Sequence, residues 1–334
     1  MREYLNKVFS GEKLNKLESE NVMDIIINNQ ANNEQVSAFL GAISSRGVSS
    51  KEIVGFVKSI RKHSIKINLD NPYLIDVCGT GGDNKDTFNI STAVAFVVAG
   101  AGIPVIKHGN GAVSSKSGSI DVLRRLGVNV ELKESEIIDS IDKNNLSFIF
   151  APLFNPAMKN VASIRKSIGV KTVFNILGPL CNPANVKKQI IGVYDHKLIN
   201  VIAEAMLELD YTEAFIISSI DGMDEFSLSD KTKVCHLKNN KINEYYLSPE
   251  DLGFNTQSID NFNGGDSQKN SEIIESILKG EKSSYRDIVI ANSAIALQLT
   301  GLNDLETAVK IAENSIDSGK AFSKLESLRE LCKI

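Results

Sequence analysis

The sequence predicts an α/β protein in which a small N-terminal α-helical domain precedes a larger domain with a mainly parallel central sheet. Apolar residues recur at helical spacing between residues 21 and 63. From residue 74 onward, short apolar strands alternate with helices, which is typical of parallel sheets. The polar segment Lys66–Pro72 separates the two patterns, and 334 residues are enough for one large and one smaller domain. We expect domains at residues 1–66 and 73–334, with a segment near 160–186 packing at their junction.

The N-terminal elements are predicted by the spacing of their apolar residues. Val22, Ile25 and Ile26 mark one helical face, and a second face follows from Val36 to Ile43. Ser49 and Ser50 precede a further periodic stretch, which predicts a capped helix ending near His63.

The larger domain is predicted from short apolar runs and the helices between them. The expected strands are Leu74–Val77, Pro104–Ile106, Phe148–Ala151, Gln189–Val193 and Ala214–Ser218. Helices are expected to begin at Ser91, Ser119 and Pro156. Val234–Leu237 and Ile242–Leu247 resemble a hairpin around Lys238–Lys241, and about the last sixty residues are predicted to be helical.

Composition excludes several classes of function. With 42% hydrophobic residues, 23% charged residues and a formal net charge of -4, the chain has no general attraction for polyanions, so we expect no nucleic-acid partner. The four cysteines are widely separated, which argues against zinc or redox pairs and favours reduced thiols in the cytoplasm. The N-terminus carries charges where a signal peptide would be apolar. The apolar tract Thr92–Ile106 is too short and too interrupted for a membrane helix, so no membrane partner is expected.

The first candidate site is the stretch Asp76–Asp83, in which an apolar strand runs into three glycines. A helix is expected to open just beyond it, within Thr87–Thr92. Glycines let the backbone turn its N–H groups inward, and a helix start adds free donors, so an anionic phosphate is the natural ligand. The alternative is a tight turn that binds nothing. The third glycine of a dinucleotide fingerprint would fall at Asn84, and no P-loop motif occurs, which disfavours plain dinucleotide or ATP sites.

The second candidate is the segment Lys107–Ser119, which concentrates cations, hydroxyls and glycines in one loop. A phosphate ester near Lys107, Ser115 and Ser119 would meet charge-assisted donors from several directions. The competing interpretation is a solvated polar loop, and His108 alone is more often structural than catalytic.

Of two further candidate sites, one is an acidic pair and the other is a single arginine. Asp224 and Glu225 follow the apolar strand Phe215–Ile217, and adjacent carboxylates there can hold Mg²⁺ together with substrate phosphates; an exposed acidic turn is the alternative. Arg165 lies in a predicted helix that begins at a strand end, where it could grip a carboxylate bidentately or be a solvated surface group.

Taken in order, these motifs resemble the anthranilate phosphoribosyltransferase family over most of the chain. The resemblance rests on the following segments: Cys78–Asp83, Thr87–Thr92, Lys107–Asn110, Ser114–Ser119, Asp121–Leu123, Asn155–Lys159, Phe174–Leu180 and Asp224–Ser227. It implies the fold shared with pyrimidine nucleoside phosphorylases, usually as a homodimer. It also implies transfer of a phosphoribosyl group from phosphoribosyl pyrophosphate to anthranilate with Mg²⁺, a step of tryptophan biosynthesis.

The resemblance also implies roles for matching positions. Mg²⁺ would engage Ser91, Asp224 and Glu225, and anthranilate would contact Gly79, Asn110 and Arg165. The donor would be lined by Gly79, Gly82, Asp83, Thr87, Asn89, Ile90, Ser91, Thr92, Lys107, His108, Gly109, Asn110, Gly111, Ala112, Val113, Ser114, Ser115 and Ser119. We expect no covalent nucleophile, because an aromatic amine is already neutral at physiological pH.

Two positions depart from the family pattern, and three other functions remain open. Gly111 stands where arginine is common, which bears on phosphate grip, and Asn155 stands where histidine is common, near the aromatic acceptor. The alternatives are a nucleoside phosphorylase of the same fold and a phosphoribosyltransferase for another aromatic amine. A protein that binds the sugar donor without catalysis belongs to a third class.

Overall fold

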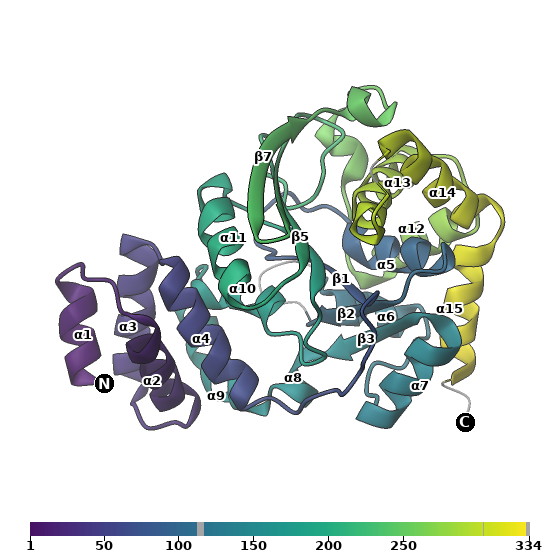
Figure 1. Ribbon diagram of the computed structural model, residues 1–334. Helices are drawn as coiled ribbons and strands as arrows, with labels where there is room; N and C mark the ends of the chain where they lie inside the picture. The colour runs from purple at the N-terminus through teal and green to yellow at the C-terminus, as the bar shows by residue number, and fades with distance from the viewer. Residues whose placement is uncertain (112–116, 303, 332–334) are drawn as a thin grey trace.

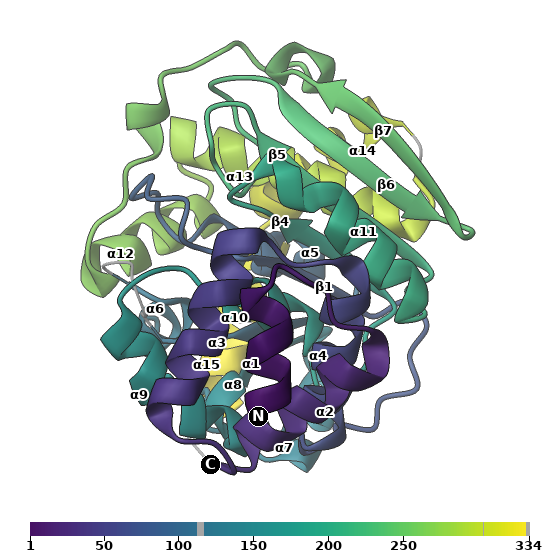
Figure 2. The ribbon, with the colours of Figure 1, turned by 90° about the vertical axis from the view of Figure 1, so that its left-hand side faces the viewer.

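The computed structural model describes residues 1–111, 117–302 and 304–331, apart from the side chain of Ala157. A helical bundle lies at one side of a larger α/β domain (Figure 1), and Figure 2 shows the same molecule with the bundle toward the viewer. No single described helix has both the length and the apolar character needed to cross a membrane, and only the sharply bent pair 284–300 and 305–317 has them when taken together.

Four helices form the N-terminal bundle, namely α1 (Arg2–Phe9), α2 (Lys16–Ile27), α3 (Asn33–Arg46) and α4 (Ser50–Lys62). The last three begin with capping boxes, in which the N-cap side chain and the N3 side chain satisfy each other's free backbone N–H groups. The predicted cap at Ser49 and the predicted end near His63 are confirmed.

The central sheet has seven strands in the order β3-β2-β1-β4-β5-β6-β7. The strands are β1 (Ile75–Gly79), β2 (Val105–Gly109), β3 (Leu146–Phe150), β4 (Lys188–Gly192), β5 (Glu213–Ser219), β6 (Thr232–Lys238) and β7 (Lys241–Leu247). The first five run parallel, and β6 and β7 add an antiparallel edge, so the mainly parallel sheet is confirmed. Asn239 and Asn240, both at positive φ, make the predicted hairpin turn.

Alternate residues of the strands enter two different cores. On β5, Phe215 and Ile217 belong to one apolar cluster, whereas Ala214 and Ile216 belong to another. This alternation follows from the two-residue period of a strand, and apolar residues on both faces are expected for a covered parallel sheet.

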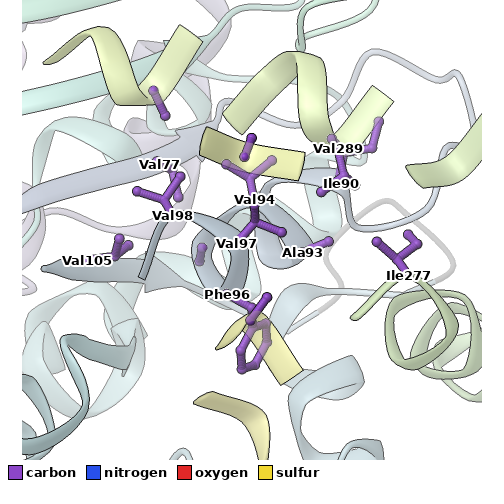
Figure 3. Packing of buried hydrophobic residues seen from close by; sticks show 14 of the residues in the cluster. Val77, Ile90, Ala93, Val94, Phe96, Val97, Val98, Val105, Ile277 and Val289 are labelled. Atoms are coloured by element: carbon purple, nitrogen blue, oxygen red, sulfur yellow. The ribbon is translucent and has the colours of Figure 1, made fainter. Parts of the chain in front are cut away.

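The first core is centred on α5 (Ile90–Gly100), which is buried along nearly its whole length. Figure 3 shows Val94, Phe96 and Val97 of α5 packed among residues from several elements, including Val77 of β1. The helices on this side are α6 (Ser119–Arg125), α12 (Ser267–Leu278), α13 (Ser284–Leu297), α14 (Leu305–Asp317) and α15 (Lys320–Glu330). The predicted helical C-terminal region is therefore confirmed for the described residues.

The second core joins the sheet to the N-terminal bundle. Three helices share this core with α1–α4, namely α9 (Lys159–Ile168), α10 (Val173–Leu180) and α11 (Ile199–Glu208). Arg61 at the end of α4 donates hydrogen bonds to the Leu180 carbonyl at 2.9 Å and to the Tyr211 hydroxyl at 2.9 Å. The bundle is thus bound to the larger domain by both apolar packing and polar contacts.

Several predicted boundaries differ from the structure. The helix expected from Pro156 begins as a 3₁₀ turn, Pro156–Met158, after the short α8 (Ala151–Phe154), and α9 starts only at Lys159. Helix α7 (Glu134–Asn144) was not predicted. Strand β2 extends to Gly109, so Lys107 and His108 lie in the sheet and not in the loop where the sequence analysis placed them. The remaining 3₁₀ turns are His196–Leu198, Pro249–Leu252, Ile259–Phe262 and Gln298–Thr300.

Candidate active site

A cavity of about 460 Å³ opens beyond the carboxyl ends of the parallel strands. After β1 the chain builds β2 and β3 on one side of the sheet and then returns to place β4 on the other side of β1. Such a change of direction leaves a crevice between neighbouring loops, and ligands of open α/β sheets bind there. The cavity is lined from this crevice, from the end of α4 and from α8, α9 and α10.

Most of the predicted site residues come together around this cavity. Those that line it are Gly79, Gly82, Asp83, Thr87, Asn89, Ile90, Ser91, Lys107, His108, Gly109, Asn110, Gly111, Ser119, Arg165, Asp224 and Glu225. Thr92 does not line it, because its side chain is turned into the core and fully buried. Ala112, Val113, Ser114 and Ser115 lie outside the described residues.

The glycine-rich loop turns where β1 ends, and its shape depends on missing side chains. Gly81 and Gly82 have φ values of +66° and +78°, which residues with a Cβ rarely adopt. A Cβ on Gly79 would collide with the Asp224 carboxylate. The Gly81 N–H donates to Asp224 Oδ2 at 2.7 Å, so this loop and the acidic segment are directly bonded.

Lys107 is 4% exposed, and its ammonium group is held in place from the sheet. The Nζ atom donates to the Val77 carbonyl at 2.6 Å and to Ser91 Oγ at 3.1 Å. A lysine ammonium has three N–H groups, so one remains for a ligand. The buried cation thus stands at the start of α5, where the helix dipole also favours an anion.

Asp224 and Glu225 lie in the same polar wall and are costly to ionise. Burial, and then the charge of Asp83, raise the pKa of Asp224 to about 7. Burial, and then Asp224, raise the pKa of Glu225 to about 8, while Lys107 and the Ser91 backbone act in the opposite direction. If Asp83, Asp224 and Glu225 were all ionised, the polar wall would therefore carry more negative charge than Lys107 can neutralise.

These residues fit a hard divalent cation better than a soft one. Their donors are all oxygen atoms, and Asp83 Oδ2 is buried without a hydrogen-bond partner among the described residues. Over the same described ranges, no group of three or more His, Cys, Asp or Glu side chains is placed to hold a metal ion. The chain itself would therefore supply only part of a coordination shell, and ligand oxygens and water would supply the rest.

The opposite wall is more apolar and carries the partly exposed cation Arg165. This residue of α9 lies over the Phe174 ring, with its guanidinium carbon 5.4 Å from the ring centroid. Burial is the one cause that shifts its pKa, downward, and no ion pair joins it to a carboxylate in the part of the chain that the structure describes. A half-buried arginine without an anion can receive a carboxylate or a phosphate.

His108 stands between the two walls and is neutral. Burial is the largest effect and lowers the pKa of His108 to about 4, against the hydrogen bond to Gly178. The ring contacts Asn155, so one of the two positions that depart from the family pattern lies at the cavity. The other, Gly111, also lines it, and its N–H donates to Asn110 Oδ1 at 2.8 Å.

Sequence reasoning assigned no individual role to the residues that support the cavity walls. Gly192, at the end of β4, packs so closely on the Asp224 carbonyl that no Cβ would fit, and its own carbonyl accepts from Thr80 N–H at 2.8 Å. Asp76 is fully buried and accepts hydrogen bonds from Asn182 at 2.9 Å and Gln189 at 3.1 Å. A buried aspartate within an apolar strand was the one signal that could have revealed this network.

Comparison with known proteins places the whole chain in one group. Residues 2–64 match the model of the glycosyl transferase family, helical bundle domain, and residues 71–322 match that of the glycosyl transferase family, a/b domain. The chain is 45% identical over 329 residues to the anthranilate phosphoribosyltransferase of Clostridium kluyveri, covering 98% of each.

Solved structures agree with these matches. The crystal structure of anthranilate phosphoribosyltransferase from Thermus thermophilus superposes with a TM-score of 0.93 at 32% identity, covering 99% of each chain. The enzyme from Saccharomyces cerevisiae in complex with PRPP and Mg superposes with a TM-score of 0.91 at 29% identity, covering 99% of this chain and 97% of that one.

Proposed function

The chain belongs to the anthranilate phosphoribosyltransferase family, and from that premise we propose how its cavity works. The enzyme transfers the phosphoribosyl group of 5-phospho-α-D-ribose 1-diphosphate to the amino nitrogen of anthranilate. The products are N-(5-phosphoribosyl)anthranilate and diphosphate, in the biosynthesis of L-tryptophan. The observation that carries the proposal is that one cavity holds two separate anion receptors, Lys107 on the polar wall and Arg165 on the apolar wall.

The polar wall takes the donor. The remaining N–H of Lys107 binds a phosphate oxygen at the start of α5, where the helix dipole also favours an anion. Asn89, Ser91 and the glycine loop line the same side. The full donor-binding set is that given for the family resemblance, except Thr92, whose buried side chain does not line the cavity.

Asp224, Glu225 and Ser91 would hold Mg²⁺, whose positive charge would offset the negative charge that builds on the departing diphosphate. The raised pKa values of the two carboxyl groups support this assignment, because a site prepared for a cation is costly to ionise without it. The yeast relative has been solved with PRPP and Mg bound.

The apolar wall takes anthranilate. Arg165 pairs with its carboxylate, and Gly79 and Asn110 complete the contact on the side of the donor. The amino lone pair then attacks C1 of the ribose as the bond from C1 to diphosphate breaks. The resulting arylammonium is a strong acid and passes its proton to water, so the reaction needs no enzyme nucleophile. Positioning two substrates in line supplies much of the rate.

We further propose that the enzyme is a cytoplasmic homodimer. Phe9 and Leu17 are apolar side chains of the N-terminal bundle that are 63% and 66% exposed, and a second copy of the chain would cover them. Cys78, Cys181 and Cys235 carry free, buried thiols, which suits a reducing compartment.

A fluorescence assay tests the function. Anthranilate fluorescence should fall when the protein is mixed with phosphoribosyl pyrophosphate and Mg²⁺, and it should stay constant when either is left out. Consumption of a different aromatic amine, with anthranilate unchanged, would support the same phosphoribosyl transfer to a different acceptor. Phosphate-dependent cleavage of a nucleoside would instead support a phosphorylase.

A further inference from the structure

A chain of hydrogen bonds crosses the wall behind the acceptor side of the cavity. Ser64 Oγ contacts Asn155 Oδ1, and Asn155 Nδ2 lies 3.3 Å from His108 Nε2. His108 Nδ1 lies 3.2 Å from the Gly178 carbonyl oxygen. The four residues come from the end of α4, from the segment after α8, from β2 and from α10, so the chain joins the N-terminal bundle to the larger domain.

The positions of the protons follow from what each group can donate. A carbonyl oxygen only accepts, so the Gly178 contact requires a proton on His108 Nδ1. A neutral imidazole has one N–H, and His108 Nε2 is therefore an acceptor that faces the NH₂ group of Asn155. Asn155 Oδ1 then accepts the hydroxyl proton of Ser64.

The opposite orientation of the Asn155 amide is incompatible with the contact between His108 and the Gly178 carbonyl. If the Asn155 amide were turned by 180°, its oxygen would face Nε2, which would have to carry the ring proton. His108 Nδ1 would then present a lone pair to the Gly178 carbonyl oxygen at 3.2 Å, which is repulsive. Ser64 Oγ also lies 2.8 Å from the Ile60 carbonyl oxygen, but a hydroxyl has one proton, and an Asn155 amide that donates to His108 directs this proton to Asn155 Oδ1.

We propose that Asn155 is a positioning residue: its NH₂ group binds the Nε2 lone pair of the His108 Nδ1–H tautomer and, together with the Gly178 contact, fixes the ring in the acceptor wall of the cavity. The backbone of Asn155 is itself held, since its N–H donates to Ala151 at 2.9 Å and its carbonyl accepts from Met158 at 3.0 Å. Only the side-chain amide of Asn155 can rotate, and its hydrogen bond with Ser64 opposes that rotation. That the wall faces anthranilate rests on the proposed function, whereas the tautomer does not.

The consequence is a ring that is fixed in orientation and has no free lone pair. Asn155 and His108 are 4% and 9% exposed, so water cannot easily replace a lost partner. His108 lines the cavity together with Arg165, and a ring free to rotate would disturb the surface on which the aromatic acceptor lies.

Nitrogen NMR of protein labelled with ¹⁵N-histidine tests the proposal. The chain has only four histidines, and the His108→Gln variant assigns the signals of His108 by their loss. The wild type should show a protonated Nδ1 and an unprotonated Nε2. Asn155→Ala should keep the proton on Nδ1, which the Gly178 carbonyl requires, but should shift the Nε2 signal to that of a lone pair without a donor, and Asn155→Asp should protonate Nε2 as well.

Kinetics on the same variants separate positioning from a merely structural role. Asn155→Ala should raise the KM for anthranilate roughly fivefold to tenfold, with little change in the KM for phosphoribosyl pyrophosphate. Asn144→Ala removes another buried asparagine, at the end of α7 and outside the cavity, and should change neither constant. If the Asn155 variants do not fold, Ser64→Ala, which removes a partner of the Asn155 amide, should also shift the Nε2 signal of His108.

A proton on Nε2 in the wild type would overturn the proposal. So would an unchanged Nε2 signal in Asn155→Ala, or in Ser64→Ala where the Asn155 variants cannot be obtained. An Nδ1–H tautomer in a protein that does not consume anthranilate would leave this inference standing and reject the proposed function alone.

Discussion

Gly192 and Asp224 approach each other so closely that a Cβ on the glycine would overlap the carbonyl oxygen of the aspartate. The end of β4 thereby fixes the backbone on which the acidic pair is carried. We predict that Gly192→Ala displaces Asp224, lowers the free energy of unfolding by about 1–3 kcal/mol and lowers kcat/KM on the order of a hundredfold. Chemical denaturation and initial rates at limiting Mg²⁺ check these values.

Gly41→Ala is the matched control for that change. Gly41 lies within α3, is exposed, and has no heavy atom within 4 Å of where its Cβ would be. Alanine at this helix position should leave activity unchanged and stabilise the fold by up to about 1 kcal/mol. Equal effects of the two variants would remove the special role assigned to Gly192.

Stability in the absence of Mg²⁺ should depend on the ionisation of Asp224. Its folded pKa, about 7, lies above the ordinary value of 3.8, so between these values the folded state binds more protons than the unfolded state. The stability contributed by this group is full below about pH 4 and is lost as the pH rises toward 7. Asp224→Asn should therefore raise the Tm in EDTA more at pH 8 than at pH 5.

The exposed Asp142 provides the comparison. Asp142→Asn, on the surface of α7, should show no such difference between the two pH values. A larger gain for Asp224→Asn at pH 5 than at pH 8 would have the wrong sign for a buried carboxyl group with a raised pKa.

Mg²⁺ should compete with protons at the acidic pair. Because the pKa values of Asp224 and Glu225 are about 7 and 8, the apparent affinity for Mg²⁺ should increase from pH 6 to pH 8. The double change of Asp224 and Glu225 to alanine should sharply reduce turnover at limiting Mg²⁺. If the rates of the double variant match those of the wild type throughout a Mg²⁺ titration, Asp224 and Glu225 do not hold the metal ion.

Arg165 should act on the acceptor and not on the donor. We predict that Arg165→Ala raises the KM for anthranilate by roughly tenfold to a hundredfold, which corresponds to the loss of a charge-assisted contact. The KM for phosphoribosyl pyrophosphate should change much less. Lys166→Ala, on the exposed side of the same helix, should alter neither value. A larger effect on the donor would reassign Arg165 to the phosphate side.

Local patterns predicted the fold well, because periodicity and capping act over a few residues. Ser49 and Gly81 are examples in which the residue type itself specifies the local conformation. The boundary of β2 was predicted too early because Lys107 and His108 are unusual in a buried strand. Their place in the sheet depends on partners far along the chain, including the carbonyls of Val77 and Gly178.

The candidate site was predictable where its residues form continuous motifs and not where distant segments meet. The glycine loop and the acidic pair are visible in the sequence, but the bond from the Gly81 N–H to Asp224 joins residues that are 143 positions apart. Gly192, Gln189 and Asn182 carry no local signal, since only packing against Asp224 and Asp76 gives them a role.

Mass spectrometry of the reaction mixture tests the central claim most directly. With anthranilate, phosphoribosyl pyrophosphate and Mg²⁺, the wild type should form N-(5-phosphoribosyl)anthranilate and diphosphate in equal amounts. Arg165→Ala should form the same product more slowly at low anthranilate. Diphosphate release without the adduct, or an adduct formed equally well by the Asp224 and Glu225 double variant without Mg²⁺, would contradict a cavity that joins these two substrates.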